Sequence, residues 1–233
     1  MVFSSLVFLC VFFPLQMLVY TLARGIEARN TVLIFFSLVF YAWGEPFYIV
    51  LLVFMAFADW LVSQGIYRFR GKGASKAFLV LGCVIDLGLL AFFKYGMFVT
   101  KNTHNWFGFP EVIPQIALPI GISFYTFQLL SYMVDVYRGE VPSQRYVRRL
   151  LLYVSLFHQC IAGPIVRYKD VSEQILSRHV DGEDMRNGIN RFVSGLAKKV
   201  LLAHVCGQLP RRTILEAALA THTHNQATLA PPP

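Results

Sequence analysis

The chain contains a series of long apolar blocks that hold few or no charged residues. The blocks lie at about 2–23, 31–43, 46–63, 77–93 and 112–134. A helix that spans a membrane needs about 20 apolar residues. Charged residues make up only 15% of the chain, whereas a soluble domain has about 25%. The pattern predicts an all-α fold, a polytopic membrane helical bundle, because backbone polar groups in lipid must be satisfied within the helix.

The distribution of positive charge predicts how often the chain crosses the membrane. Residues 44–46, Gly-Glu-Pro, favour a break between the second and third blocks. With that break there are five spans, and the loops 68–76 and 138–149, with four Lys or Arg each, share a side with Arg24. The positive-inside rule places this side in the cytoplasm. A single long span at 31–63 would put loop 68–76 outside, so two spans are favoured.

The uncharged run at 150–166 has 17 residues, the short limit for a span. If it crossed, the segment 167–199 with seven Lys or Arg would lie outside. Gly163 and Pro164 provide a break inside the run, and broken backbone at membrane depth must be enclosed by protein or line a wet cavity. The sequence therefore predicts a re-entrant loop over 150–166, followed by a partial helix at 190–203.

A polar stripe runs along the fifth block. Gln128, Ser131 and Asp135 have i, i+3, i+7 spacing and so share one helix face. Such a stripe fits a helix that lines a conduit, and it also fits hydrogen bonding between helices. Asp59 and Asp86 also interrupt apolar blocks, where ionisable residues face the protein interior or a cavity. A structural role and a functional role both stay open for them.

Nucleic-acid binding and metal binding are not indicated. The net charge is +8, but the positive residues lie between apolar blocks and no RNA- or zinc-binding motif accompanies them. The four cysteines lie in apolar context without CxxC spacing, which is typical of small buried side chains. We therefore expect no metal, no bound cofactor and no nucleic-acid partner.

Several motifs together resemble one family. FYAWGEPFYIVLLV, LPIGISFYTFQLLSYMVDVYRGE, FHQCIAGPIVRYKD and RFVSGLAKKVLLA occur in this order. They are similar to the membrane-bound O-acyltransferase family, in particular to its bacterial branch that O-acetylates alginate. The resemblance runs from residue 1 to about 203 and implies the N-terminal part of that fold.

The resemblance implies transfer of an acyl group to a hydroxyl, with donor and acceptor meeting in a transmembrane tunnel. The candidate tunnel-lining residues are Gln128, Ser131, Asp135, Gln159, Gly163, Pro164 and Arg167. Acetyl-CoA or an acyl carrier would be the donor, as a substrate, and an exopolysaccharide such as alginate the acceptor. Lipid and extracytoplasmic O-acetylation proteins are the implied partners, in a bacterial inner membrane that the chain crosses several times.

No catalytic residue is assigned within the chain. The family's catalytic histidine belongs to a later helix, and His158 stands where relatives more usually have proline. The segment 204–233 departs from the family pattern and is expected to be a disordered tail. We therefore expect an O-acyltransferase without its catalytic half, inactive alone. The alternative is a non-enzymatic membrane scaffold or partner-binding remnant of the same fold.

Overall fold

The computed structural model describes residues 5–107, 118–160 and 165–203, and all regular structure in these ranges is helical. The all-α prediction is confirmed. The chain divides into two units, Met1–Arg178 and His179–Pro233. The described part of the second unit is helix α9 (Gly182–Ala197), followed by one π-helical turn, η2 (Lys198–Ala203). The expected helix at 190–203 thus begins earlier, at Gly182, where the side chain of Asp181 accepts a hydrogen bond from the amide of Asp184.

The first unit begins with a hairpin of apolar helices. A π-helical turn, η1 (Phe8–Phe12), continues into α1 (Phe13–Leu22), and Gly25 with φ of 83° leads into α2 (Ile26–Gly44). Helix α2 begins five residues before the predicted block at 31–43. Its first turns contain charged residues, so the search for uncharged blocks did not include them in the predicted span. The added turns bring its length to 19 residues, long enough to cross a membrane.

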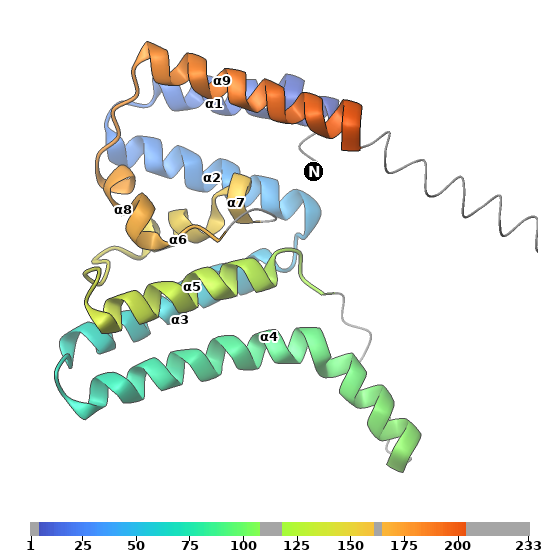
Figure 1. Cartoon of the computed structure of the whole chain (residues 1–233), viewed down its shortest axis with the longest axis vertical. Coiled ribbons are helices and arrows are strands. Elements are labelled where there is room, and N and C mark those ends of the chain that lie inside the picture. The colour runs from blue at the N-terminus through green and yellow to red at the C-terminus, as the bar shows by residue number, and fades with distance from the viewer. Residues whose placement is uncertain (1–4, 108–117, 161–164, 204–233) are drawn as a thin grey trace, which may run out of the picture. The chain divides into compact units, whose positions relative to one another are not determined.

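The break predicted at 44–46 is present, because α2 ends at Gly44 and α3 (Ile49–Arg68) begins at Ile49. After a turn with Gly71 at φ of 81°, helix α4 (Gly73–Phe107) runs for 35 residues and bends toward its C-terminal end (Figure 1). Within the described residues, three helical stretches are long and apolar enough to span a membrane. They are Ile26–Gly44, Ile49–Arg68 and Gly73–Gly96. The helical stretch Phe8–Leu22 is apolar but shorter.

The fifth predicted block, 112–134, differs from the helix that forms. Helix α5 (Ile122–Arg138) begins at Ile122, and residues 112–117 lie outside the described ranges. Pro119 and Gly121, which has φ of 78°, occupy a turn immediately before the helix. Both are residues typical of turns and helix boundaries. Their positions explain why the regular helix starts later than the apolar composition suggested.

Residues 147–176 form three short helices, α6 (Val147–Ser155), α7 (Phe157–Cys160) and α8 (Tyr168–Leu176). Helix α6 has nine residues and rises about 14 Å, less than half the thickness of the hydrocarbon core. The helix stops at Leu156, whose ψ of 115° is not helical. The described part of 150–166 is therefore not one spanning helix, and the re-entrant path stays a prediction.

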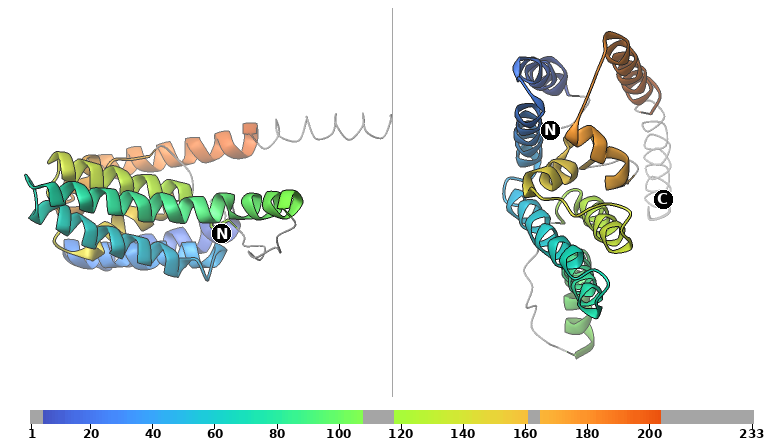
Figure 2. Two further views of the ribbon diagram at one scale, coloured as in Figure 1. Left: turned by 90° about the horizontal axis from the view of Figure 1, so that it is seen from below. Right: turned by 90° about the vertical axis from the view of Figure 1, so that its left-hand side faces the viewer.

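Most residues of the hydrophobic core come from α3, α5 and α6. Helices α3, α4 and α5 run side by side (Figures 1 and 2). Small residues allow this close approach. A Cβ atom added to Gly65 of α3 would lie 2.7 Å from the Phe78 ring, far below van der Waals contact, so the packing of α3 on α4 favours glycine there. A Cβ atom added to Gly82 of α4 would overlap Sδ of Met133, and the flexible Met133 side chain would have to move.

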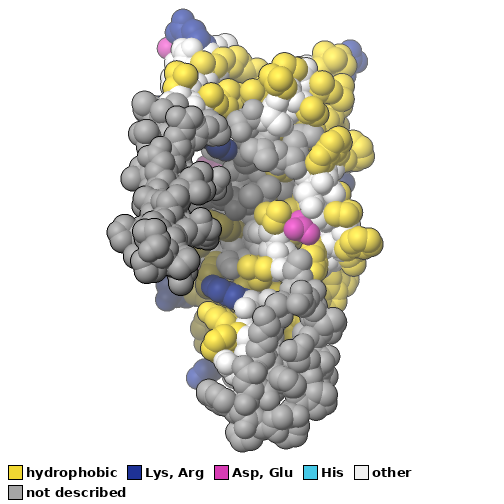
Figure 3. All heavy atoms as spheres, turned by 90° about the vertical axis from the view of Figure 1, so that its right-hand side faces the viewer, with side chains coloured by type: hydrophobic (Ala, Val, Ile, Leu, Met, Phe, Trp, Pro, Cys, Tyr) yellow, Lys and Arg dark blue, Asp and Glu magenta, His cyan; other side chains and the backbone are white. Residues whose placement is uncertain are grey.

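The outer surface is apolar, as expected for lipid contact. Side chains on α2, α3 and α4 that point outward include Trp43, Val50, Phe54 and Val84. Figure 3 shows hydrophobic side chains over much of the described surface on one face. A soluble monomer rarely exposes a continuous apolar surface of this extent. The chain is thus a membrane protein whose helices contact lipid.

The basic loops gather at one end of the first unit, at the left of Figure 1. Nη2 of Arg70 donates to the carbonyl oxygen of Arg138 over 3.4 Å, which joins loop 68–76 to loop 138–149. Nη2 of Arg149 donates to Glu27 over 2.6 Å, which joins the second loop to the start of α2. The loops that the positive-inside rule assigns to one side of the membrane therefore lie together in space.

Candidate functional site

The polar stripe on α5 faces the interior of the first unit. Gln128 and Asp135 are buried, and Ser131 is partly buried. The hydroxyl of Ser131 donates to the carbonyl oxygen of Gln128 over 2.8 Å, so its proton is used within the helix. The stripe is not a solvent-exposed helix face. It contributes polar groups to the region where α5 meets α6 and α8.

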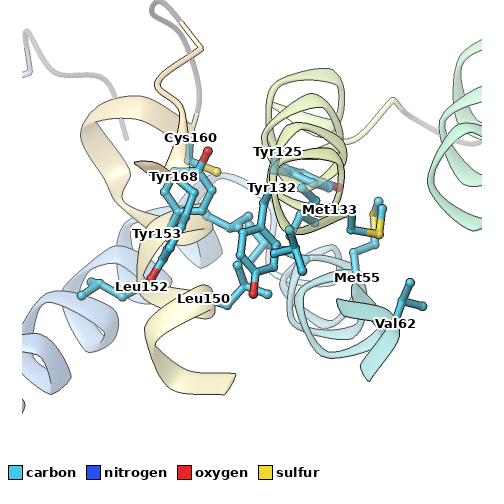
Figure 4. Close-up of a cluster of buried hydrophobic side chains, with 14 of the residues drawn as sticks. Met55, Val62, Tyr125, Tyr132, Met133, Leu150, Leu152, Tyr153, Cys160 and Tyr168 are labelled. Atoms are coloured by element: carbon cyan, nitrogen blue, oxygen red, sulfur yellow. The ribbon is translucent and has the colours of Figure 1, made fainter. Parts of the chain in front are cut away.

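Three tyrosines join these helices. The ring of Tyr168 on α8 lies edge-on to Tyr132 of α5, at a centroid distance of 5.0 Å, and to Tyr153 of α6, at 5.2 Å (Figure 4). All three side chains are fully buried. Edge-to-face contacts between rings stabilise a defined packing arrangement beyond their apolar area. The tyrosines therefore fix the relative positions of α5, α6 and α8.

Tyr153 also shows that the chain after α6 turns back. Its hydroxyl donates to the carbonyl oxygen of Val166 over 2.6 Å, and its own carbonyl oxygen accepts from Nε2 of Gln159 over 2.6 Å. A straight helix would separate residues 153 and 166 by about 20 Å. A tyrosine hydroxyl lies far closer than that to its own backbone. The segment that follows α6 thus returns toward α6 instead of continuing away from it.

The connection between α5 and α6 is fixed against α3. The hydroxyl of Tyr132 accepts from the amide of Gln144 over 2.8 Å and donates to Oγ of Ser63 over 3.3 Å. The carbonyl oxygen of Gln144 accepts from Nε1 of Trp60 over 2.8 Å and from Nε2 of Gln64 over 2.5 Å. These bonds satisfy both backbone groups of Gln144, which is buried.

Arg167 lies at the start of α8, as its N-cap residue, and its side chain is exposed. The next residue, Tyr168, is completely buried. Arg167, Arg138 and Lys169 all act electrostatically on the buried carboxylate of Asp135. Arg167 therefore lies near the basic end of the bundle, with Asp135 as an interior acidic neighbour.

Asp59 on α3 and Asp86 on α4 are both fully buried, and their carboxyl groups lie against each other. No other residue in the described ranges donates a hydrogen bond to them. They face the protein interior, as expected for ionisable residues in apolar helices.

The predicted tunnel-lining residues can be placed only in part. Gln128, Ser131 and Asp135 share α5, and Gln159 is buried on α7. Gly163 and Pro164 lie outside the described residues. A tunnel beside these residues stays a prediction. Within the described ranges, no group of three His, Cys, Asp or Glu side chains is arranged to hold a metal ion.

His158 has an exposed side chain whose ring lies edge-on to Phe157 at 5.5 Å. No described acidic side chain forms an ion pair with it.

The sequence did not identify the roles of Tyr153 and Ser63. A tyrosine inside an apolar block is a usable signal, because a buried phenol usually finds a hydrogen-bond partner, but the partner is set by the tertiary fold.

Comparison with known proteins identifies relatives among bacterial O-acetylases. The chain is 38% identical over 215 residues to a Pseudomonas aeruginosa protein named probable alginate O-acetylase AlgI, a match that covers 90% of this chain and 41% of that protein. It is 38% identical over 209 residues to the Azotobacter vinelandii protein of the same name, covering 87% and 42%. A Helicobacter pylori peptidoglycan O-acetyltransferase is 28% identical over 236 residues, covering 87% and 44%.

The chain thus spans about two fifths of the length of these relatives. No family profile matches it, and no solved structure matches it significantly. The similarity nevertheless extends over nearly the whole chain and includes the apolar helices described above. By this homology the chain is similar to bacterial O-acetylases over about two fifths of their length, which agrees with its resemblance to the membrane-bound O-acyltransferase family.

Proposed function

We propose that the chain forms part of a multi-pass O-acetyltransferase of a bacterial inner membrane, which acetylates hydroxyl groups of an extracellular glycan. The observation that carries the proposal is the 38% identity over 90% of the chain to a protein named as an alginate O-acetylase. Alginate-type exopolysaccharide is the favoured acceptor, because the alginate relatives are 34–38% identical and the peptidoglycan relative 28%.

The chemistry that we propose is acyl transfer from a thioester, either acetyl-CoA or an acyl carrier. A sugar hydroxyl oxygen attacks the acetyl carbonyl carbon, and the thiolate leaves when the tetrahedral intermediate collapses. A base takes the hydroxyl proton and returns it to the leaving sulfur. Hydrogen-bond donors stabilise the intermediate oxyanion. We propose that the base comes from the part of the family's length that this chain does not cover.

In this proposal the described helices form the wall and the cytoplasmic mouth of the reaction chamber. The tyrosines of α5, α6 and α8 hold the returning segment in place, which supports a rigid wall. The gathering of Lys and Arg at one end favours the cytoplasm for that end. Donor would enter there, while acceptor and extracytoplasmic partner proteins would meet the opposite end.

A chimera tests the proposal. The matching segment of the Pseudomonas aeruginosa relative is replaced by this chain, and acetyl esters on secreted alginate are measured in a strain that lacks the relative. Restored acetylation supports an acetyltransferase role for this segment. A chimera that inserts in the membrane at normal abundance and leaves alginate unacetylated contradicts the proposed acceptor. Full acetylation by this chain alone would contradict the proposal that the base lies outside this chain.

A further inference from the structure

A basic pocket lies at the turn between α3 and α4, at the end of the bundle that gathers the charged loops. Its volume is about 560 Å³, and its lining includes the turn residues, the first turn of α4 and the C-terminal end of α5. The charged side chains of the lining are Arg70, Lys72, Lys76 and Arg138. The described lining contains no aspartate or glutamate.

Among the described residues, none of the four positive side chains forms an ion pair, and the salt bridges at this end of the chain use Arg148, Arg149 and Lys169 instead. One of the four, Arg138, acts electrostatically on the carboxyl group of Asp135, which is buried in α5 and does not line the pocket. Four cations around one concavity repel each other, and a bound anion would remove that cost.

The pocket is held by specific backbone geometry. Gly139 has φ of 78°, and a Cβ atom at this position would overlap the guanidinium of Arg70. Glycine therefore lets the Arg70 guanidinium lie across the end of α5, where it donates to the Arg138 carbonyl oxygen. On the other side, Ser75 donates from its hydroxyl to the carbonyl oxygen of Ile66 over 3.0 Å and fixes the turn. These two hydrogen bonds therefore hold the backbone that carries the four cationic side chains in a defined position.

The position of the pocket indicates the kind of anion. Helices α3 and α4 are long and apolar enough to cross a membrane, so the turn between them lies at the level of lipid headgroups. Tyr137 lines the pocket and is partly exposed, and tyrosine is enriched at the interface between membrane and water. Arg and Lys bind phosphate oxygens through charge-assisted hydrogen bonds.

We propose that this pocket is a binding site for a phosphate group, supplied either by an anionic lipid headgroup or by a soluble phosphate compound. The site is separate from the residues assigned to acyl transfer, and the proposal does not depend on that activity. Its chemistry is recognition of a phosphate anion by Arg70, Lys72, Lys76 and Arg138.

Binding by the full-length chain in detergent tests the proposal with two probes. Native mass spectrometry measures bound phosphatidylglycerol against phosphatidylcholine, and calorimetry measures binding of inorganic pyrophosphate. The pocket variant is K72Q/K76Q, and the matched control is R24Q/R145Q, which removes two exposed cations from the same end outside the pocket lining. Because all four side chains are exposed, both variants are expected to fold, and thermal unfolding checks this.

We expect the wild type to prefer one probe and K72Q/K76Q to weaken its binding at least about tenfold, with the control within about threefold of wild type. A preference for phosphatidylglycerol identifies a lipid headgroup as the source, and binding of pyrophosphate alone identifies a soluble one. Equal losses in the two variants would show diffuse charge attraction and overturn the site. Absence of binding by the wild type to both probes would overturn it as well.

Discussion

The hydroxyl of Tyr153 on α6 donates a 2.6 Å hydrogen bond to the carbonyl oxygen of Val166, 13 positions further along the chain. This single bond connects a buried helix to the segment that leads into α8. Removal of the Tyr153 hydroxyl oxygen would therefore remove this hydrogen bond between α6 and the returning segment. A partly buried carbonyl oxygen that loses its donor is left incompletely compensated.

Tyr153→Phe is expected to lower the free energy of unfolding by about 1–2 kcal/mol, because the ring contact with Tyr168 remains while the hydrogen bond is lost. Tyr146→Phe is the control, since Tyr146 is exposed and its ring keeps the cation–π contacts with nearby arginines. Thermal unfolding of the purified chain in detergent measures both. Equal melting temperatures would show that the bond to Val166 contributes nothing to stability.

Gly139→Ala is expected to destabilise the first unit by about 1–2 kcal/mol, because L residues are strained at the φ of 78° found there. It should also displace Arg70. In the background of Arg70→Ala, only the backbone cost should remain. Gly88→Ala is the control, because a Cβ atom there meets nothing within 4 Å. Similar melting temperatures for Gly139→Ala and Gly88→Ala would contradict the proposed strain.

The apolar blocks predicted most of the helices, and Gly-Glu-Pro at 44–46 predicted the break between two of them. The start of α2 could not be predicted in the same way. Glu27 lies in its first turn and pairs with Arg149, over 2.6 Å, and with Arg148, over 3.2 Å. A pattern search treats such charges as the end of an apolar helix, because the partners that compensate them are more than 120 positions away in sequence.

The candidate site shows the same division between local pattern and tertiary contact. Spacing alone placed Gln128, Ser131 and Asp135 on one face of a helix, and that face is turned inward. Spacing does not reveal that Tyr168 lies between Tyr132 and Tyr153, because the three come from different helices. The chemistry of the residues was visible in the sequence, while their arrangement depended on packing.

Asn30→Ala is expected to lower the free energy of unfolding by about 2–3 kcal/mol. Asn30 is buried, donates over 3.0 Å to the carbonyl oxygen of Ile175, and accepts from the guanidinium of Arg178. It thus joins α2 to the end of α8. Thr31→Ala is the matched control, because its hydroxyl bonds only within an exposed helix turn. The prediction fails if chemical denaturation gives both variants the same stability.

Arg167→Ala, placed in the chimera with the Pseudomonas aeruginosa relative, is expected to lower alginate acetylation at least about fivefold by removing a cation from the cytoplasmic mouth. Membrane abundance should not change, because the Arg167 side chain is exposed. Arg186→Ala on α9 is the control, since its contact with Glu183 is a long, exposed ion pair of 3.6 Å. Unchanged acetylation by Arg167→Ala would contradict a role for this cation at the cytoplasmic mouth.

The re-entrant path predicts that positions 145 and 180 lie on the same side of the membrane, because a segment that enters and returns does not change sides. Single cysteines at these exposed positions, in a chain without its native cysteines, are labelled with an impermeant maleimide in whole cells and in lysed cells. We expect both sites to react only after lysis. Labelling of one site in whole cells would mean that 150–166 crosses the membrane, and the loop-charge argument for a cytoplasmic segment at 167–199 would then be wrong.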